Sequence, residues 1–255
     1  MANDVVDLED VVKRWALDMF DYTKSKEQAK IPRDCLLTTI SWNKVRFQHS
    51  QAEYVDKWKP PSPKAKVLFR TTFCNNTDQE QEYSFKTQRN TRSTCEVVIE
   101  SGYCMGVSMD VKLATPCEVF EANAGFHRET SLTNINGETI EEELSWGVDS
   151  QIKVPRKSKT AASLVIDEDE FSSNFTMTTT VSGKVHVTLT SLKDNNSFVK
   201  AIDGNIVDIM RREAENGLKG LTVERNAIKI ITKGSCKFSY GIQQHIQLDT
   251  EPIQS

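Results

Sequence analysis

The longest regular pattern of the chain lies between Phe175 and Thr190. Its odd-numbered positions are mainly Phe, Met, Val and Leu, whereas its even-numbered positions are Thr, Ser, Lys and His. A period of two residues places the apolar side chains on one face of a β-strand. Because strands usually have about 5–6 residues, a run roughly three times as long predicts an extended sheet or a barrel around it.

A second alternating run lies between Ile140 and Val154. Glu142 and Ser150 interrupt its apolar face, and Pro155 ends it because proline has no N–H to donate to a β-ladder. This run predicts another long strand. Its apolar even positions are Ile140, Leu144, Trp146, Val148, Ile152 and Val154.

Shorter patterns predict further elements, and together they indicate a mainly β fold. Strands are expected at 67–74, 83–99, 158–171 and 221–248. A helix is expected over 205–215, where Ile206, Ile209 and Met210 form a stripe and Gly217 suits the C-cap.

Two amphipathic stretches around Pro116 predict a hairpin over about 102–130. Apolar residues occupy alternate positions on both sides of the proline, and polar residues lie between them. The predicted apolar face is Val107, Met109, Val111, Leu113, Phe120, Ala122, Ala124 and Phe126. The predicted polar face is Ser108, Asp110, Lys112, Glu121, Asn123 and His127.

The hairpin pattern has two interpretations. Each stretch has about nine residues, and a strand that crosses a membrane needs about 9–11, apolar toward lipid and polar toward the lumen. An ordinary surface hairpin that covers a core has the same alternation. The residues alone leave both interpretations open.

The N-terminal segment predicts an amphipathic helix, which Asn3 or Asp4 would cap. Its apolar stripe would pack on the body of the protein. The alternative is an interfacial membrane helix, which the early acidic residues disfavour because anionic lipid repels them. The stripe is Val5, Leu8, Val12, Trp15, Met19 and Tyr22.

Aromatic residues gather before a Pro-rich run at 59–64, which predicts a linker. We therefore expect a helical and aromatic head at 1–65 and a β-rich module at 66–255. Exposed aromatic residues of the head would suit contact with a receptor or a glycan, and a small aromatic core is the alternative. The candidates are Trp15, Trp42, Tyr54 and Trp58.

Composition limits the classes of function. The chain has 255 residues and a formal net charge of −4, so it lacks the basic character of a nucleic-acid-binding protein. No run approaches the roughly 20 apolar residues of a membrane helix. The first residues are acidic, without the apolar core of a secretory signal. We expect a soluble protein that is cytosolic or exported by a non-classical route, with its six scattered cysteines as free thiols.

No catalytic motif is present, so the sequence predicts neither an enzyme nor a cofactor. The four histidines, at positions 49, 127, 186 and 245, are scattered. The acidic runs Glu141–Glu143 and Asp167–Glu170 lack the ligand spacing of an EF-hand, so we expect a solvated surface rather than a metal site.

The order of features resembles the aerolysin-like β-pore-forming family, in the branch of the clostridial epsilon toxin and the bacterial mosquitocidal toxins. The resemblance covers about 66–248. It rests on Asn75–Asp78, Gly106-Val107, Ser131–Asn134, Trp146 with Gln151–Pro155, the Thr-rich strand to Gly183, and Ile231–Gly234 with Phe238–Gly241. The resemblance implies an elongated fold with one continuous strand through Asn136-Gly137, where the dipeptide alone predicts a hairpin. We expect the strand, with a bulge or kink at Gly137.

The same resemblance implies a cytolytic toxin. The head would bind a membrane lipid, a glycan or a protein receptor. The monomers would form a homo-oligomeric ring, and one hairpin from each would enter a shared β-barrel. The alternative is a non-lytic intracellular or vesicular protein of the same fold that binds glycan or lipid.

Overall fold

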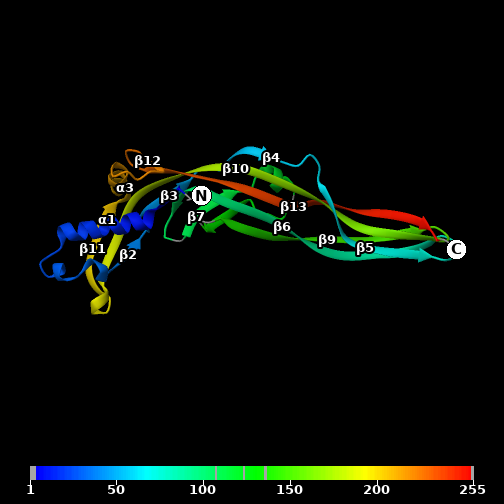
Figure 1. The fold of residues 1–255 in the computed structure, drawn as a ribbon, viewed down its shortest axis with the longest axis horizontal. Helices are drawn as coiled ribbons and strands as arrows, with labels where there is room; N and C mark the ends of the chain where they lie inside the picture. Colours follow the sequence, from blue (N-terminus) through cyan, green and yellow to red (C-terminus); the bar gives the residue numbers. More distant parts are fainter. Residues whose placement is uncertain (1–3, 107, 123, 135–136, 254–255) are drawn as a thin grey trace.

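Long strands run along the molecule in the computed structural model, which describes residues 4–106, 108–122, 124–134 and 137–253, without the side chains of Asp110 and Val111. Figure 1 shows an elongated molecule in which α1, α3, β2 and β11 lie at one end, and β5, β9 and the C-terminus at the other. The predicted mainly β, elongated fold with a small helical end is confirmed.

The central strand is β10 (Ser158–Ser191), which has 34 residues. One edge pairs with β13 (Ile228–Pro252) and then with β11 (Ser197–Asn205). The other edge pairs with a succession of shorter strands that follow one another along it. These are β5 (Lys64–Asn75), β4 (Glu53–Trp58), β3 (Val45–His49) and β2 (Leu36–Ser41).

The strands predicted at 158–171 and 175–190 are one strand. Ser172 and Asn174 pair with β4 on one edge and with β13 on the other, so the polar stretch between the two apolar runs stays extended. The predicted alternation holds, because Val181, Val185 and Leu189 are buried and Lys184 is exposed.

The other long pair is β6 (Gln81–Cys104) and β9 (Glu138–Val154), which are antiparallel. β6 continues onto β13 and ends beside the short parallel strand β1 (Asp4–Asp7). The predicted strand at 140–154 is confirmed as β9, whose even side chains are less exposed than the odd ones. The short β12 (Leu221–Val223) pairs with the start of β13.

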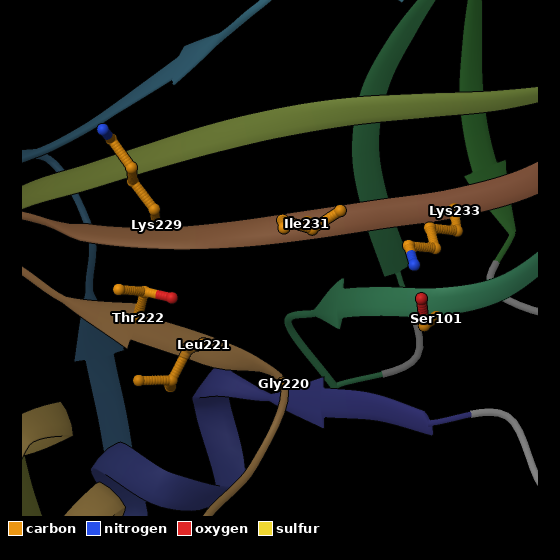
Figure 2. A pocket seen from close by; sticks show the side chains of 7 residues that line it. All are labelled: Ser101, Gly220, Leu221, Thr222, Lys229, Ile231 and Lys233. Carbon is orange, nitrogen blue, oxygen red and sulfur yellow. The ribbon is translucent and has the colours of Figure 1, made fainter. Parts of the chain in front are cut away.

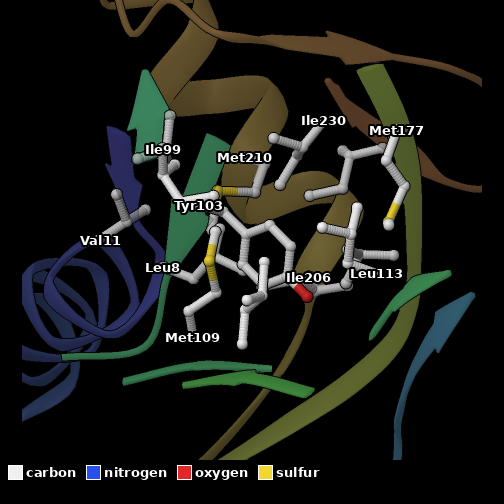
Figure 3. Close-up of a cluster of buried hydrophobic side chains, with 14 of the residues drawn as sticks. Leu8, Val11, Ile99, Tyr103, Met109, Leu113, Met177, Ile206, Met210 and Ile230 are labelled. Atoms are coloured by element: carbon white, nitrogen blue, oxygen red, sulfur yellow. The ribbon is translucent and has the colours of Figure 1, made fainter. Parts of the chain in front are cut away.

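The core has two parts. A large cluster includes residues from α1 (Leu8–Thr23), α3 (Ile206–Glu215) and the long strands, and a smaller cluster around Phe85 and Leu164 fills the end that carries β5 and β9. Figure 3 shows Met109 and Leu113 among the side chains of the large cluster. Among the described residues there are also short 3-10 helices, namely η1 (Gln28–Lys30), η2 (Arg33–Cys35) and η3 (Leu192–Asp194).

The N-terminal helix starts later than predicted. Its cap is Asp7, whose side chain accepts a hydrogen bond from the Glu9 N–H at 2.9 Å. Asp4 lies at the start of β1, three residues before the cap position, and Asn3 lies outside the described residues. The packing stripe is confirmed at Leu8 and Val12, which are buried, but Tyr22 is 79% exposed.

The predicted second helix is confirmed as α3. Asn205 caps it by accepting a hydrogen bond from the Val207 N–H at 3.0 Å. Gly217 follows the helix end with φ +100°, the left-handed conformation that glycine adopts without strain.

The hairpin differs from its prediction in the second half. β7 (Ser108–Ala114) confirms the first strand, but Cys117–Glu121 form the short helix α2, and the second strand is β8 (Glu129–Asn134). The carbonyl of Pro116 accepts hydrogen bonds from the N–H groups of Val119 and Phe120, which start a helical turn where a strand was expected.

The expected continuous strand through 136–137 is also corrected. β8 pairs with β7, whereas β9 pairs with β6 in another sheet. Between them Gly137 has φ +100°, and a Cβ atom there would lie 2.5 Å from the Val97 carbonyl oxygen. Asn136 lies outside the described residues.

Candidate functional site: an amphipathic hairpin

The hairpin of residues 108–134 forms a two-stranded sheet of its own. β7 and β8 are antiparallel, with Ala114 opposite Glu129 and Ser108 opposite Asn134. It is joined to the body mainly by side chains, because β7 and β8 bond to each other and not to the large sheet. The long ladders of the body therefore do not include the two strands of the hairpin.

The two faces of the hairpin differ in burial. Met109 and Leu113 are 2% exposed and Leu132 is 1% exposed, all in the large core cluster. Ser108 and Lys112 on β7, and Ser131 and Thr133 on β8, are exposed. The apolar face is therefore hidden against the body while the polar face meets water.

The connection between the two strands also hides apolar side chains. Val119 and Ala124 are buried, and the Phe126 ring meets the Phe238 ring edge-on, with 5.2 Å between centroids. Phe120 is 40% exposed, and the Arg128 guanidinium lies over its ring at 5.6 Å. This connection is folded and packed, with α2 at its centre.

The predicted lipid-facing residues lie in several environments. Met109, Leu113, Ala124 and Phe126 are buried, Ala122 is half-buried and Phe120 is exposed. Val107 and the Val111 side chain lie outside the described residues. The sequence prediction missed β8, whose Leu132 alternates with Ser131 and Thr133. This alternation is present in the sequence, but three residues are too short a run to predict a strand.

The predicted polar-face residues that the structure describes are all exposed. These are Ser108, Lys112, Glu121 and His127. The Asp110 side chain and Asn123 lie outside the described residues. In this conformation Ser108, Asp110 and Lys112 belong to β7, whereas Glu121 ends α2 and His127 precedes β8.

The aromatic candidates are mostly covered. Trp15 is 9% exposed and packs in the core, and Trp42 and Tyr54 are half-buried against it. We expected some of these four side chains to be exposed; Trp58 on β4 is, at 52%, and Trp15 is not. The burial follows from position, because α1 turns its apolar stripe toward α3 and the strands.

Other apolar side chains are exposed at the end that carries α1 and β11. Tyr22 is 79% exposed, Phe198 is 68% exposed and Leu192 is 54% exposed. A cleft of about 410 Å³ beside Phe198 is also lined by Lys30, Ile31 and Lys193. Tyr22 ends the predicted helical stripe, whereas Leu192 in η3 and Phe198 in β11 belong to no periodic pattern, so the sequence did not reveal them.

A sequence profile of the family described as Clostridium epsilon toxin ETX/Bacillus mosquitocidal toxin MTX2 matches residues 38–255. The chain belongs to this epsilon toxin/mosquitocidal toxin family. A search of curated proteins found no match. The family match confirms the branch that the sequence resembles, that of the epsilon toxin and the mosquitocidal toxins.

Two solved structures share the fold of this toxin-family chain. A non-toxic crystal protein from Bacillus thuringiensis has a TM-score of 0.58 and 16% identity, and the match covers 98% of each chain. The Cry23Aa1 and Cry37Aa1 binary complex has a TM-score of 0.55 and 13% identity, with 98% of this chain and 91% of that chain covered.

The acidic run of this toxin-family protein is more ordered than expected. Glu170 pairs with Lys64 at 2.9 Å and Glu168 with Lys66 at 2.9 Å, so the run belongs to an ion-pair ladder between β10 and β5. In the part of the chain that the structure describes, no group of His, Cys, Asp or Glu could hold a metal ion. No helix there is long and apolar enough to cross a bilayer.

A separate groove lies on the outer side of β13, between β12 and the end of β6. Its volume is about 310 Å³, and Figure 2 shows Lys229, Ile231 and Lys233 along it with Ser101 opposite. Ile231 is 46% exposed, and Lys229 pairs with Glu224 at 2.7 Å. The two lysines lie four residues apart on an extended strand, so they do not converge on one ligand.

Proposed function

We propose that this toxin-family protein binds a membrane receptor, assembles into a homo-oligomeric ring and inserts one hairpin per protomer into a shared β-barrel. The observation that carries the proposal is the amphipathic hairpin of residues 108–134. It has its own sheet, its apolar face is buried, and its polar face meets water. Turning that apolar face toward lipid is the change that insertion requires.

The lengths of the strands support a refolding step. β7 has 7 residues and β8 has 6, whereas a membrane-crossing strand needs about 9–11. The connection at 115–128 therefore has to become extended. Alternate residues would then face lipid, namely Val107, Met109, Val111 and Leu113 on one strand and Phe120, Ala122, Ala124 and Phe126 on the other.

Assembly follows from the backbone. An inserted hairpin has unpaired N–H and C=O groups along both edges, and each such group costs several kcal/mol in hydrocarbon. Hairpins from neighbouring protomers satisfy these groups only when the barrel closes. The partner that insertion requires is therefore further copies of this chain.

First contact with the membrane or its receptor would come from the end that carries α1 and β11. Tyr22, Leu192 and Phe198 are the exposed apolar groups there, with Lys30 and Lys193 beside the cleft. This surface replaces Trp15 as the candidate for a lipid, glycan or protein receptor, and Trp58 stays a candidate on the side of the body.

The test is dye release from liposomes by two neighbouring variants. Ala122→Arg puts a charge on the proposed lipid face, where an arginine costs about 2–4 kcal/mol near the midplane. Glu121→Arg puts the same side chain on the proposed lumen face. We expect Ala122→Arg to lose release and Glu121→Arg to keep it, with both monomers retaining the wild-type thermal transition. Equal release by both variants would remove the hairpin from the mechanism.

The second candidate is a non-lytic binding protein. The observation that favours it is that a solved structure with this fold is described as a non-toxic crystal protein, so this fold does not by itself imply lysis. Binding to membranes without dye release, at every concentration tested, would favour this candidate.

A further inference from the structure

A segment outside the hairpin links residues 115–128, which connect β7 to β8, to the body of the protein. We call residues 53–66 the strap: it consists of β4, the Pro-rich connection and the start of β5. We propose that the strap is the regulatory clasp of the hairpin, and that its contacts with the hairpin must break before the hairpin leaves. This inference rests on the proposed function, and its test does not require a pore.

The strap touches the hairpin at two polar points. The Tyr54 hydroxyl donates a hydrogen bond to the Ala114 carbonyl at the end of β7. The Lys57 ammonium donates to the Glu118 carboxylate at 2.7 Å, in the first turn of α2. Both points lie near Pro116, where the chain leaves β7, so they hold the part of the hairpin that has to refold.

A β-bulge in β4 turns the side chains of Tyr54 and Lys57 toward the hairpin. In a regular strand Tyr54 and Lys57 would point to opposite faces, because successive side chains alternate. The β4–β10 register shifts between Ser172 and Asn174, and Asp56 there has φ +55°, a left-handed conformation that is uncommon outside glycine. The extra residue brings Lys57 to the same side as Tyr54.

The other side of the strap is anchored firmly to β10. The Ser173 hydroxyl donates to the Val55 carbonyl at 2.6 Å, and beyond β4 the lysines form an ion-pair ladder with the acidic run. The pairs are Lys59–Asp169 at 3.4 Å, Lys64–Glu170 at 2.9 Å and Lys66–Glu168 at 2.9 Å. The strap therefore joins the hairpin to the longest strand of the molecule.

The strap and the hairpin also meet at a cleft of about 690 Å³. Tyr54 and Lys57 of the strap line it, together with Pro116, Glu118 and Phe120 of the hairpin. The two polar points are side-chain contacts, so they can break while the backbone pairing of β4 with β10 stays intact.

The hairpin lies over two buried thiols. Phe126 of the hairpin packs on Phe238, which lies opposite Cys95 in the β6–β13 ladder and two residues from Cys236 on the same face of β13. Cys95 and Cys236 are each 1% exposed. Lifting of the strap and hairpin would uncover them, so their alkylation rate reports opening in the absence of any membrane.

The experiment measures maleimide labelling of Cys95 and Cys236 in a Cys35→Ser, Cys74→Ser, Cys104→Ala, Cys117→Ser background. When opening is fast relative to labelling, the rate follows the open population. We expect Lys57→Glu to speed labelling about two- to five-fold, and Tyr54→Phe about five-fold. The charge swap Lys57→Glu with Glu118→Lys should restore the slow rate.

The matched control is Lys86→Glu. Lys86 on β6 pairs with Asp149 on β9 at 2.9 Å, and both side chains are exposed. Neither residue belongs to the strap or to the hairpin. This variant should leave labelling unchanged. Wild-type labelling rates in both Lys57→Glu and Tyr54→Phe would overturn the clasp. Faster labelling without dye release would instead support the clasp and contradict the pore.

Discussion

Asp7 and Gly106 join the start of α1 to the base of the hairpin. The Asp7 carboxylate accepts a hydrogen bond from the Gly106 N–H at 3.1 Å, and the same oxygen accepts from the Glu9 N–H at 2.9 Å. One side chain therefore caps a helix and holds the point where the chain leaves β6. The N-terminal segment and the strap hold opposite ends of β7.

The double role of Asp7 predicts two effects of one substitution. Asp7→Ala should lower the free energy of unfolding by about 1 kcal/mol through the lost cap, and should also speed hydrogen exchange at the amides of β7. Asn205→Ala is the matched control, because Asn205 caps α3 in the same way without touching the hairpin. A β7 exchange rate that rises equally in both variants would show that Asp7 acts only through stability.

Acid should loosen the strap through Glu118. The hydrogen bond from Lys57 is the main cause that lowers the pKa of Glu118 below its ordinary value of 4.5. The pair therefore stabilises the closed hairpin above about pH 4.5 and loses that effect as the pH falls through the lowered pKa. The labelling rate of Cys95 and Cys236 is taken relative to that of the same thiols in the unfolded protein at each pH, because maleimide reacts with the thiolate. This relative rate should increase as the pH falls below about 4.5.

One variant distinguishes the effect of the Lys57–Glu118 pair from the effect of acid on the other carboxylates. Glu118→Gln cannot titrate, so its labelling rate should start higher at pH 6 and change less toward low pH. Glu170, whose pKa is lowered mainly by Lys64, titrates in the same direction and remains in both proteins. Identical pH profiles for wild type and Glu118→Gln would contradict the role of the Lys57–Glu118 pair.

The pore should prefer cations. On the proposed lumen face Asp110 and Glu121 outnumber Lys112, Glu118 lies near the turn, and rings of acidic side chains favour cations. Reversal potentials across a salt gradient should show this preference, weakening toward 1 M salt, where the Debye length is about 3 Å. Glu121→Gln should reduce it and Lys112→Gln should increase it. Anion selectivity would mean that the faces are assigned wrongly.

Receptor contact should depend on the exposed end of the molecule. Phe198→Ala and Tyr22→Ala should each reduce binding to susceptible cells without shifting the melting temperature, because both side chains are largely exposed. Trp58→Ala, an equally apolar change on β4, tests the aromatic candidate predicted from the sequence. Loss of binding only in Trp58→Ala would move the contact surface to the side of the body.

The sequence predicted the strands whose side chains alternate over many residues. The run from Phe175 to Thr190 was recognisable because one face of β10 is buried and the other is not. Its continuity with 158–171 was not, because Ser172–Asn174 are polar and are kept extended by pairing with β4 and β13. Backbone pairing between distant segments leaves no periodic trace in the side chains.

The sequence predicted the position of the hairpin in the chain but not its conformation in the structure. Phe120, Ala122, Ala124 and Phe126 alternate as in a strand, yet the structure places the first in α2 and the others in the connection to β8. Local hydrogen bonds to the Pro116 carbonyl and the packing of Phe126 on Phe238 outweigh a short period-two pattern. That pattern is expected to describe the inserted state instead. The division of the chain at residue 65 stays a prediction.

A scan with an environment-sensitive dye tests this central expectation most directly. The dye would be placed on single cysteines at 112, 113, 121 and 122 in a background without the native six. On membranes the account predicts blue-shifted, lipid-like emission at 113 and 122 and water-like emission at 112 and 121. Emission that does not alternate, or that equals the emission without membranes at all four positions, would contradict insertion of this hairpin as a β-barrel strand pair.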